Sequence, residues 1–213
     1  MTDPKSTGPA SLRAADIESA AARAAAKELA DGTGPAAAAR AAIAVADRVM
    51  AGLALNPESG EVVAGAVCAP GCGWCCHQVV GVTVAEEEMV EQAVSALDAE
   101  ARDRLARRTR EAEARLSRLP MEQWQGARVP CPALEEARCV IHASRPLPCR
   151  AVLSTDAEIC RRWLEGDDVK IPLLAVPRRV YSLAQAGLAQ ALAAHGIPPG
   201  PTPLAETLAM ILG

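Results

Sequence analysis

Apolar residues recur with a helical period over most of the chain, and alanine supplies many of them. The first such stretch covers residues 11–30 and is followed by glycines at Gly32 and Gly34. The second runs from Pro35 to about Leu55. Glycine commonly ends a helix, and proline is tolerated in a first helical turn. The pattern therefore predicts a helical hairpin that packs on the rest of the chain or on a second copy.

A longer apolar pattern follows a Gly/Pro-rich loop. The β-branched run 79–84 predicts a short strand, and Thr83 with Glu86 forms a capping box that begins a helix. The helical period then continues to Pro120. One unbroken helix over this segment would be about 50 Å long, at 1.5 Å per residue. We predict a break near Asp98, an N-cap residue type, because a hairpin returns the two flanks of the segment to each other.

The remaining segments are shorter. Residues 131–142 resemble a small turn or hairpin, and Thr155 with Glu158 is predicted to cap a helix. Further helices are predicted over residues 177–194 and from Pro203 almost to the end of the chain. The predicted fold is mainly α, with helical hairpins around an irregular cysteine-rich core and at most one or two short strands.

Composition supports this fold class and restricts the partners. Half of the 213 residues are apolar, yet aromatics make up only 2% and phenylalanine is absent. A core of Leu, Val, Ile and Ala favours closely packed helices. The net charge of −4 argues against a nucleic-acid surface, and no apolar stretch is long enough to span a bilayer. We expect neither a nucleic-acid nor a membrane partner.

Arginines are concentrated in the predicted helix over residues 102–118, at Arg102, Arg104, Arg107, Arg108, Arg110, Arg115 and Arg118. A nucleic-acid helix is one interpretation. However, Glu100, Asp103 and Glu111 each lie four residues before an arginine, which is typical of a salt-bridged, solvated face. We therefore predict an exposed helix without a binding role.

The candidate chemistry lies in eight cysteines, arranged in two blocks with one trailing member: Cys68, Cys72, Cys75, Cys76, Cys131, Cys139, Cys149 and Cys160. The N-terminus has no secretory pattern, so we expect a cytoplasmic chain with reduced thiols. Clustered cysteines in a reducing compartment more often bind metal than form a disulfide framework. The cysteine-rich core is therefore predicted to bind a metal ion.

Spacing suggests how the sulfurs would share the metal. Cys72 and Cys75 form a Cys-x-x-Cys pair, and two thiolates of the second block would complete a tetrahedral zinc site. The same four sulfurs could hold an iron–sulfur cluster instead. Cys76 is adjacent to Cys75, and neighbouring side chains diverge, so these two residues would serve different metal atoms. Two sites and one polynuclear centre both remain open, and His77 and His142 are minor candidate ligands.

Arginines beside the second block are candidates for offsetting thiolate charge. Four thiolates around one divalent ion leave a net double negative charge, which is costly away from water. Arg145 and Arg150 flank Cys149, and their guanidinium groups can hydrogen-bond to sulfur. We predict this role for both residues, whereas Arg138 is interpreted as an ordinary surface arginine.

Two motifs give the chain a family resemblance. The run C-G-W-C-C-H, followed by C-P-A-L…C-V-I-H-A-S-R-P-L-P-C-R, resembles the YkgJ-type cysteine cluster family, with the pattern CxxCxxCC and a later RPxxCR. Cys68 lies one residue further from Cys72 than that pattern requires. The resemblance covers about residues 66–165 and implies a zinc- or iron-chelating domain. Flagellin lysine methylases carry a similar cluster, so an enzymatic role is possible by analogy.

These observations define three functional hypotheses. The first is a metal-binding protein holding iron, including an iron–sulfur centre, or zinc. The second is a small metalloenzyme or methyl-transfer-type protein that uses the cluster, and the third is an interaction module built on structural zinc. We divide the chain into residues 1–56, a disordered lead plus the Ala-rich hairpin, and residues 57–213, the metal-binding domain with its C-terminal helices. A protein partner or homo-oligomer is neither indicated nor excluded.

Overall fold

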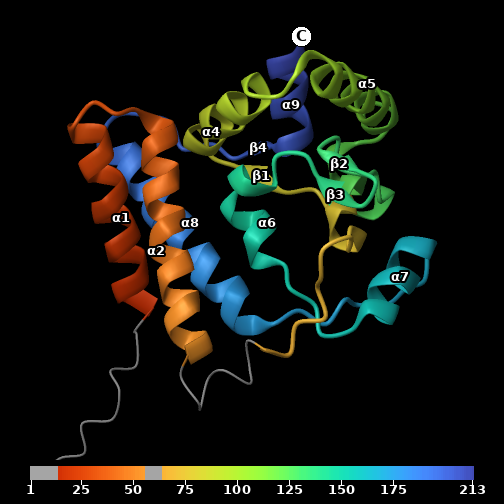
Figure 1. The fold of residues 1–213 in the computed structure, drawn as a ribbon, viewed down its shortest axis with the longest axis horizontal. Coiled ribbons are helices and arrows are strands. Elements are labelled where there is room, and N and C mark those ends of the chain that lie inside the picture. Colours follow the sequence, from red (N-terminus) through yellow and green to blue (C-terminus); the bar gives the residue numbers. More distant parts are fainter. Residues whose placement is uncertain (1–13, 56–63) are drawn as a thin grey trace, which may run out of the picture.

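A computed structural model describes residues 14–55 and 64–213, and these residues are mainly helical (Figure 1). The α-helices are α1 (Ala14–Ala30), α2 (Pro35–Leu55), α4 (Val84–Ser95), α5 (Ala99–Leu116), α6 (Leu147–Ala151), α7 (Ala157–Glu165), α8 (Ala175–Ala194) and α9 (Leu204–Leu212). Three 3₁₀ helices join them: η1 (Trp74–His77), η2 (Met121–Ala127) and η3 (His142–Ser144). The predicted fold class is confirmed.

Two small antiparallel sheets complete the described secondary structure. Strand β1 (Gly81–Val82) pairs with β4 (Thr202–Pro203), which joins the centre of the chain to its C-terminal end. Strand β2 (Leu134–Glu135) pairs with β3 (Arg138–Cys139) to form the hairpin predicted in the second cysteine block. The pairing of β1 with β4 was not predicted, because a two-residue strand leaves no alternating pattern in the sequence.

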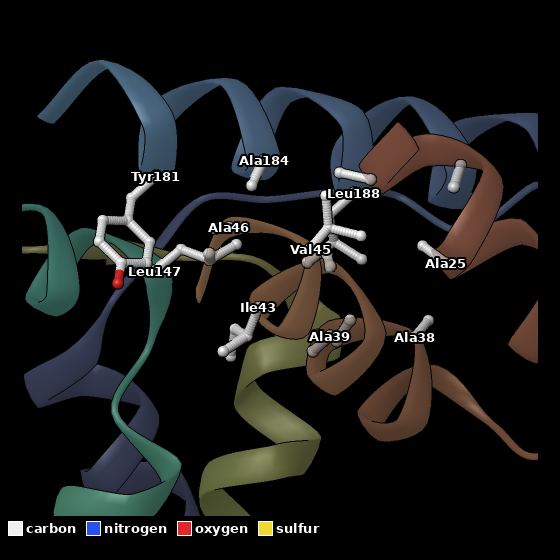
Figure 2. Packing of buried hydrophobic residues seen from close by; sticks show 14 of the residues in the cluster. Ala25, Ala38, Ala39, Ile43, Val45, Ala46, Leu147, Tyr181, Ala184 and Leu188 are labelled. Atoms are coloured by element: carbon white, nitrogen blue, oxygen red, sulfur yellow. The ribbon is translucent and has the colours of Figure 1, made fainter. Parts of the chain in front are cut away.

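The predicted N-terminal hairpin is present and packs against α8 (Figure 1). Alanines dominate this contact: Ala21 and Ala25 of α1 and Ala39 of α2 are fully buried. Figure 2 shows Val45 of α2 on the side of α8, whereas Ile43 and Ala39 lie on the side of α4. Small side chains allow close approach of the three helices. Helices α1, α2 and α8 share one core, which therefore contains residues from both sides of the predicted boundary at residue 56. The division of the chain into two domains at this boundary stays a prediction.

The predicted helix break at Asp98 is confirmed. Thr83 and Glu86 form the expected capping box at the start of α4. The Asp98 side chain accepts a hydrogen bond from the backbone N–H of Ala101, which begins α5. The hairpin made by α4 and α5 returns the chain towards its starting point, so the two cysteine blocks can meet.

A second core lies beneath this hairpin and supports the cysteine region. Its buried members come from β1, α4, α5 and α9 and from the loops around the second cysteine block. Cys131, Cys139 and Cys149 are partly buried and pack against it. These three thiols therefore lie at the edge of an apolar layer rather than on an exposed loop.

Two details of the helices differ from the sequence-based expectation. The N-cap of α7 is Asp156, whose side chain accepts from the backbone N–H of Ile159, whereas Glu158 pairs with Arg161. The capping box predicted for Thr155 and Glu158 was therefore one residue out of register. Helix α8 begins at Ala175 rather than at the predicted proline, because proline is tolerated throughout a first helical turn.

Helix α5 is not the simple solvated helix that was predicted. Leu105, Thr109, Ala112 and Leu116 are buried on one face. Of the three expected pairs along the helix, Glu100 with Arg104 is the one formed among the described residues, at 3.9 Å. Arg104 and Arg108 bind Glu135 of β2 instead, both at 2.8 Å from its Oε1 atom. Part of the arginine cluster therefore holds the second cysteine block in place. In the part of the chain described, no helix is both long and apolar enough for a membrane span.

Candidate metal centre

Both cysteine blocks line one cavity of about 770 Å³. Its cysteines are Cys68, Cys72, Cys75, Cys76, Cys131, Cys139 and Cys149. The backbone N–H of Cys131 donates to the carbonyl of Cys76 at 2.7 Å, so the two blocks are in direct contact. All eight cysteines are free thiols. The structure thus brings the blocks together, as a shared site requires, while the identity of the ligands stays a prediction.

The first block is shaped by close contact with the β2–β3 hairpin. Gly73 lies against this hairpin: a Cβ atom there would be 3.1 Å from the Leu134 side chain and 3.4 Å from the Cα of Ala137. Gly71 has a φ of +90°, a conformation that glycine adopts without strain. A turn closed by a hydrogen bond from Cys72 N–H to Ala69 O then leads into η1. The glycines therefore allow the loop to fold tightly over the second block.

The second block is held by a buried carboxylate. Oε1 of Glu86 accepts a 2.8 Å hydrogen bond from the backbone N–H of Leu147, at the start of the short helix α6 that carries Cys149. Oε2 of Glu86 accepts from the backbone N–H and the hydroxyl of Thr83. Glu86 is fully buried. The capping box of α4 thereby also positions Cys149.

Ser154 connects the start of the first block with α7, the helix that carries Cys160. The backbone N–H of Val67 donates to Ser154 O at 2.9 Å, and Ser154 N–H donates to the Cys68 sulfur at 3.3 Å. The Ser154 hydroxyl donates to the carbonyl of Asp156, the N-cap residue of α7. Cys160 is buried on α7 and lies outside the cavity lining. Because α7 packs against η1, the helix of the trailing cysteine lies next to the first block.

Burial and neighbouring thiols raise the pKa of several cysteines. Burial raises the pKa of Cys131 to about 12, and it raises that of Cys149 well above the ordinary value, with further increases from Cys131 and Cys139. A hydrogen bond to Cys76, followed by burial, raises the pKa of Cys75. Metal binding requires thiolates, so an ion bound here would displace these protons. With raised pKa values the free thiols keep their protons at neutral pH, so a bound cation would have to stabilise the thiolate form.

Arg145 lines the cavity beside the thiols, as does Arg138, which the sequence analysis interpreted as an ordinary surface residue. The positive charge of Arg145 opposes the effect of burial on the pKa of Cys139 and Cys149. Its Nε atom is buried and has no hydrogen-bond partner within the described residues. A buried donor without a partner is costly, and thiolate sulfur is an acceptor that would satisfy it. This arrangement supports the role beside the thiolates that was predicted for Arg145.

Arg108 was missed by the sequence analysis. It was grouped with the solvated arginines of α5, yet its Nε–H donates to the carbonyl of Pro132 at 2.8 Å, next to Cys131. Its charge also opposes the burial that raises the pKa of Cys131. The sequence did contain a signal for this role: Arg108 lies on the same helical face as the apolar residues Leu105 and Ala112.

Arg150 has a different environment from the one predicted. Its guanidinium donates to the carbonyls of Arg145 and Ala143, both at 2.9 Å, and forms an ion pair with Asp47 of α2 at 3.2 Å. The Tyr181 hydroxyl donates to the same carboxylate at 2.9 Å. Arg150 therefore ties the loop before Cys149 to the N-terminal hairpin, and its described contacts are to oxygen and not to sulfur.

We expect Asp47→Asn to destabilise the protein by about 1–3 kcal/mol, because the change removes a charged acceptor shared by Arg150 and Tyr181. Asp31→Asn is the matched control, since Asp31 pairs with the exposed Lys27 and such pairs contribute little. Urea unfolding measures both. Equal stability of the two variants would show that the Asp47 network does not join the hairpin to the cysteine region.

The two candidate histidines differ in placement. His142 lines the cavity, and Arg145, then burial, lowers its pKa, which favours the neutral form that binds metal. Nδ1 of His77 lies 3.3 Å from the carbonyls of Gly73 and Trp74, and the residue is outside the cavity lining. Of the two, His142 is the better placed.

The donor set fits iron or zinc. Among residues 14–55 and 64–213, no three His, Cys, Asp or Glu side chains stand in a ready ligand geometry. The cavity nevertheless holds seven thiols, the buried Arg145 Nε and few competing oxygen ligands. Sulfur donors of this kind select zinc, copper(I) and iron–sulfur clusters over magnesium or calcium.

The fold and the cavity together define a helical protein in which two cysteine blocks line one cavity. Residues 67–165, slightly less than half of the chain, match the family CxxCxxCC, which is described as "Putative zinc- or iron-chelating domain". This match confirms the resemblance to a cysteine-cluster domain that was drawn from the sequence. Comparison with curated proteins finds no match, and neither does comparison with solved structures.

Proposed function

We propose that this protein binds iron, in an iron–sulfur centre, or zinc through the thiols of its cysteine cavity. One observation carries the proposal: cysteines separated by more than fifty residues line the same cavity and are joined by the hydrogen bond from Cys131 to Cys76. The reduced thiols that this role needs agree with the cytoplasmic location predicted from the sequence.

The size of the cavity favours a centre with more than one metal atom. A structural zinc site is closed and needs four ligands around a single ion. The present cavity has about 770 Å³ and seven thiols, which exceeds the needs of one tetrahedral ion. An iron–sulfur cluster is also held by four cysteines but contains several metal atoms, so it suits a cavity of this size better than one zinc ion does. The structural-zinc module is the least supported hypothesis.

The cavity also supports the metalloenzyme hypothesis as a second candidate. Apolar side chains such as Val80, Leu134 and Leu204 form part of its wall beside the thiols. Ligand sites are typically cavities of about 300–1,000 Å³ with apolar walls and a few polar groups. A small molecule would therefore have room beside a metal centre.

Purification without air tests the leading proposal. We expect stoichiometric iron with acid-labile sulfide and a brown protein, because sulfur-to-iron charge transfer absorbs visible light. Iron, zinc and sulfide are measured per chain, together with the absorption spectrum. A colourless protein with zinc would support zinc instead, and a protein without either metal would contradict metal binding by this cavity.

A further inference from the structure

The wall of the cysteine cavity carries basic side chains and no acidic ones. Apart from the thiols, its ionisable lining residues are Arg138, His142 and Arg145, and neither Asp nor Glu is among the described residues of the wall. A cleft whose fixed charges have one sign concentrates ions of the opposite sign. The charge of the wall therefore favours an anionic ligand over a cationic one.

The two arginines of the wall differ from their neighbours in having no partner. Arg108 and Arg150, on either side of the second cysteine block, form ion pairs with carboxylates. The side chains of Arg138 and Arg145, by contrast, make no hydrogen bond or ion pair with residues 14–55 and 64–213. Their guanidinium groups are therefore available to a ligand of the cavity.

Arg138 and Arg145 are placed for different partners. The buried Nε of Arg145 suits the thiolates of a metal centre, as described above. Arg138 is exposed at the start of β3, so a ligand that enters the cavity from solvent can reach it. One remaining guanidinium balances one negative charge. A carboxylate carries a single charge and accepts two parallel hydrogen bonds from arginine, whereas a phosphate monoester carries about two charges at neutral pH.

Much of the remaining wall is apolar. Val80, Ile141 and Leu204 line the cavity and belong to the second core, so they form a hydrophobic surface supported from behind. Small-molecule sites typically combine apolar walls with a few polar groups that fix the orientation of the ligand. The wall thus fits a molecule with a charged end and an apolar body.

We propose that the cavity binds a small organic carboxylate beside the metal centre, with the carboxylate on Arg138 and the apolar body against Val80, Ile141 and Leu204. The proposal rests on the metal binding proposed above and names the class of small molecule for which the cavity has room. Arg138 is thereby a specificity-determining residue and not the ordinary surface arginine expected from the sequence.

Titration calorimetry with hexanoate tests this assignment on metal-containing protein purified without air. Hexan-1-ol, which has the same chain without the charge, is expected to bind at least about tenfold more weakly, because the charged hydrogen bonds to Arg138 are missing. Arg138→Gln is expected to weaken hexanoate binding by a similar factor and to leave hexan-1-ol binding and metal content unchanged. Arg107→Gln removes the same charge from an exposed position of α5 outside the cavity lining, and hexanoate binding is expected to be unaffected.

Three results would overturn the carboxylate site: no binding of hexanoate, equal affinities for hexanoate and hexan-1-ol, or equal weakening in Arg107→Gln and Arg138→Gln. The last would show an effect of net charge and not of the cavity wall. Metal content per chain, measured on the same samples, separates this proposal from the proposed function. Protein that contains metal but does not select hexanoate contradicts the carboxylate site alone, whereas protein without metal contradicts the proposed function and this proposal with it.

Discussion

Gly187→Ala is expected to destabilise the protein by about 3 kcal/mol or more, at or above the upper end of typical overpacking costs. Gly187 lies in α8 where α1 crosses it, and a Cβ atom there would be 2.3 Å from the carbonyl oxygen of Glu18 and 2.9 Å from the backbone nitrogen of Ala22. These obstacles are backbone atoms, which cannot rotate away. The two helices would have to separate along their alanine contact.

Thermal unfolding measures this effect. For a chain of about 150–250 residues, 1 kcal/mol shifts Tm by about 2–4 °C, so a decrease of at least about 6 °C is expected. Gly52→Ala on α2 is the control, because a Cβ there has nothing within 4 Å. Alanine in a helix interior is about 0.5–1 kcal/mol better than glycine, so this variant is expected to be more stable. Equal stability of Gly187→Ala and the unaltered protein would contradict the packing of α1 on α8.

Local signals allowed much of the fold to be predicted. Helical periodicity and flanking glycine and proline identified α1 and α2, and the capping box identified the start of α4. The break at Asp98 was inferred from the requirement that the cysteine blocks meet, and the structure has it. The contact of α1 with α8 could not be predicted, because the close packing at Gly187 involves a helix more than 150 residues away in the sequence.

The candidate site was predicted less completely than the fold. Motif spacing identified the cysteines, and the structure places seven of them around one cavity. The partners of the arginines could not be predicted, because they depend on tertiary contacts: Arg150 reaches Asp47, and Arg108 reaches the loop beside Cys131. Nor does sequence spacing reveal that α7, which carries Cys160, packs against η1 of the first block, since the second block lies between them in the chain.

Glu86 links the fold to the site, and its loss is expected to be the most damaging change near the cysteines. Glu86→Ala leaves the backbone N–H groups of Thr83 and Leu147 without their acceptor, and a buried unsatisfied donor costs about 1–3 kcal/mol. A destabilisation of about 3–5 kcal/mol is therefore expected, as for removal of one partner from a buried charged network. Because Leu147 begins α6, we also expect weaker metal retention through Cys149. Urea unfolding and metal content per chain measure the two effects.

Dependence on pH distinguishes the role of the carboxylate from simple packing. Burial, opposed by the hydrogen bonds from Thr83, Leu147 and Gln185, raises the pKa of Glu86 above its ordinary value of 4.5. A group whose pKa is higher in the folded than in the unfolded state stabilises the fold below the unfolded pKa. That contribution is lost as pH rises through the folded pKa.

The isosteric Glu86→Gln variant carries no titrating group at this position. Its deficit in unfolding free energy relative to the unaltered protein is expected to be largest below about pH 4.5 and to narrow as pH rises above it, since only the carboxyl loses stabilisation with pH. Glu91→Gln, at an exposed position of the same helix, is expected to show no such trend. A deficit that stays constant or widens with pH would show that the carboxylate of Glu86 is stabilised by its four donors more than burial penalises it.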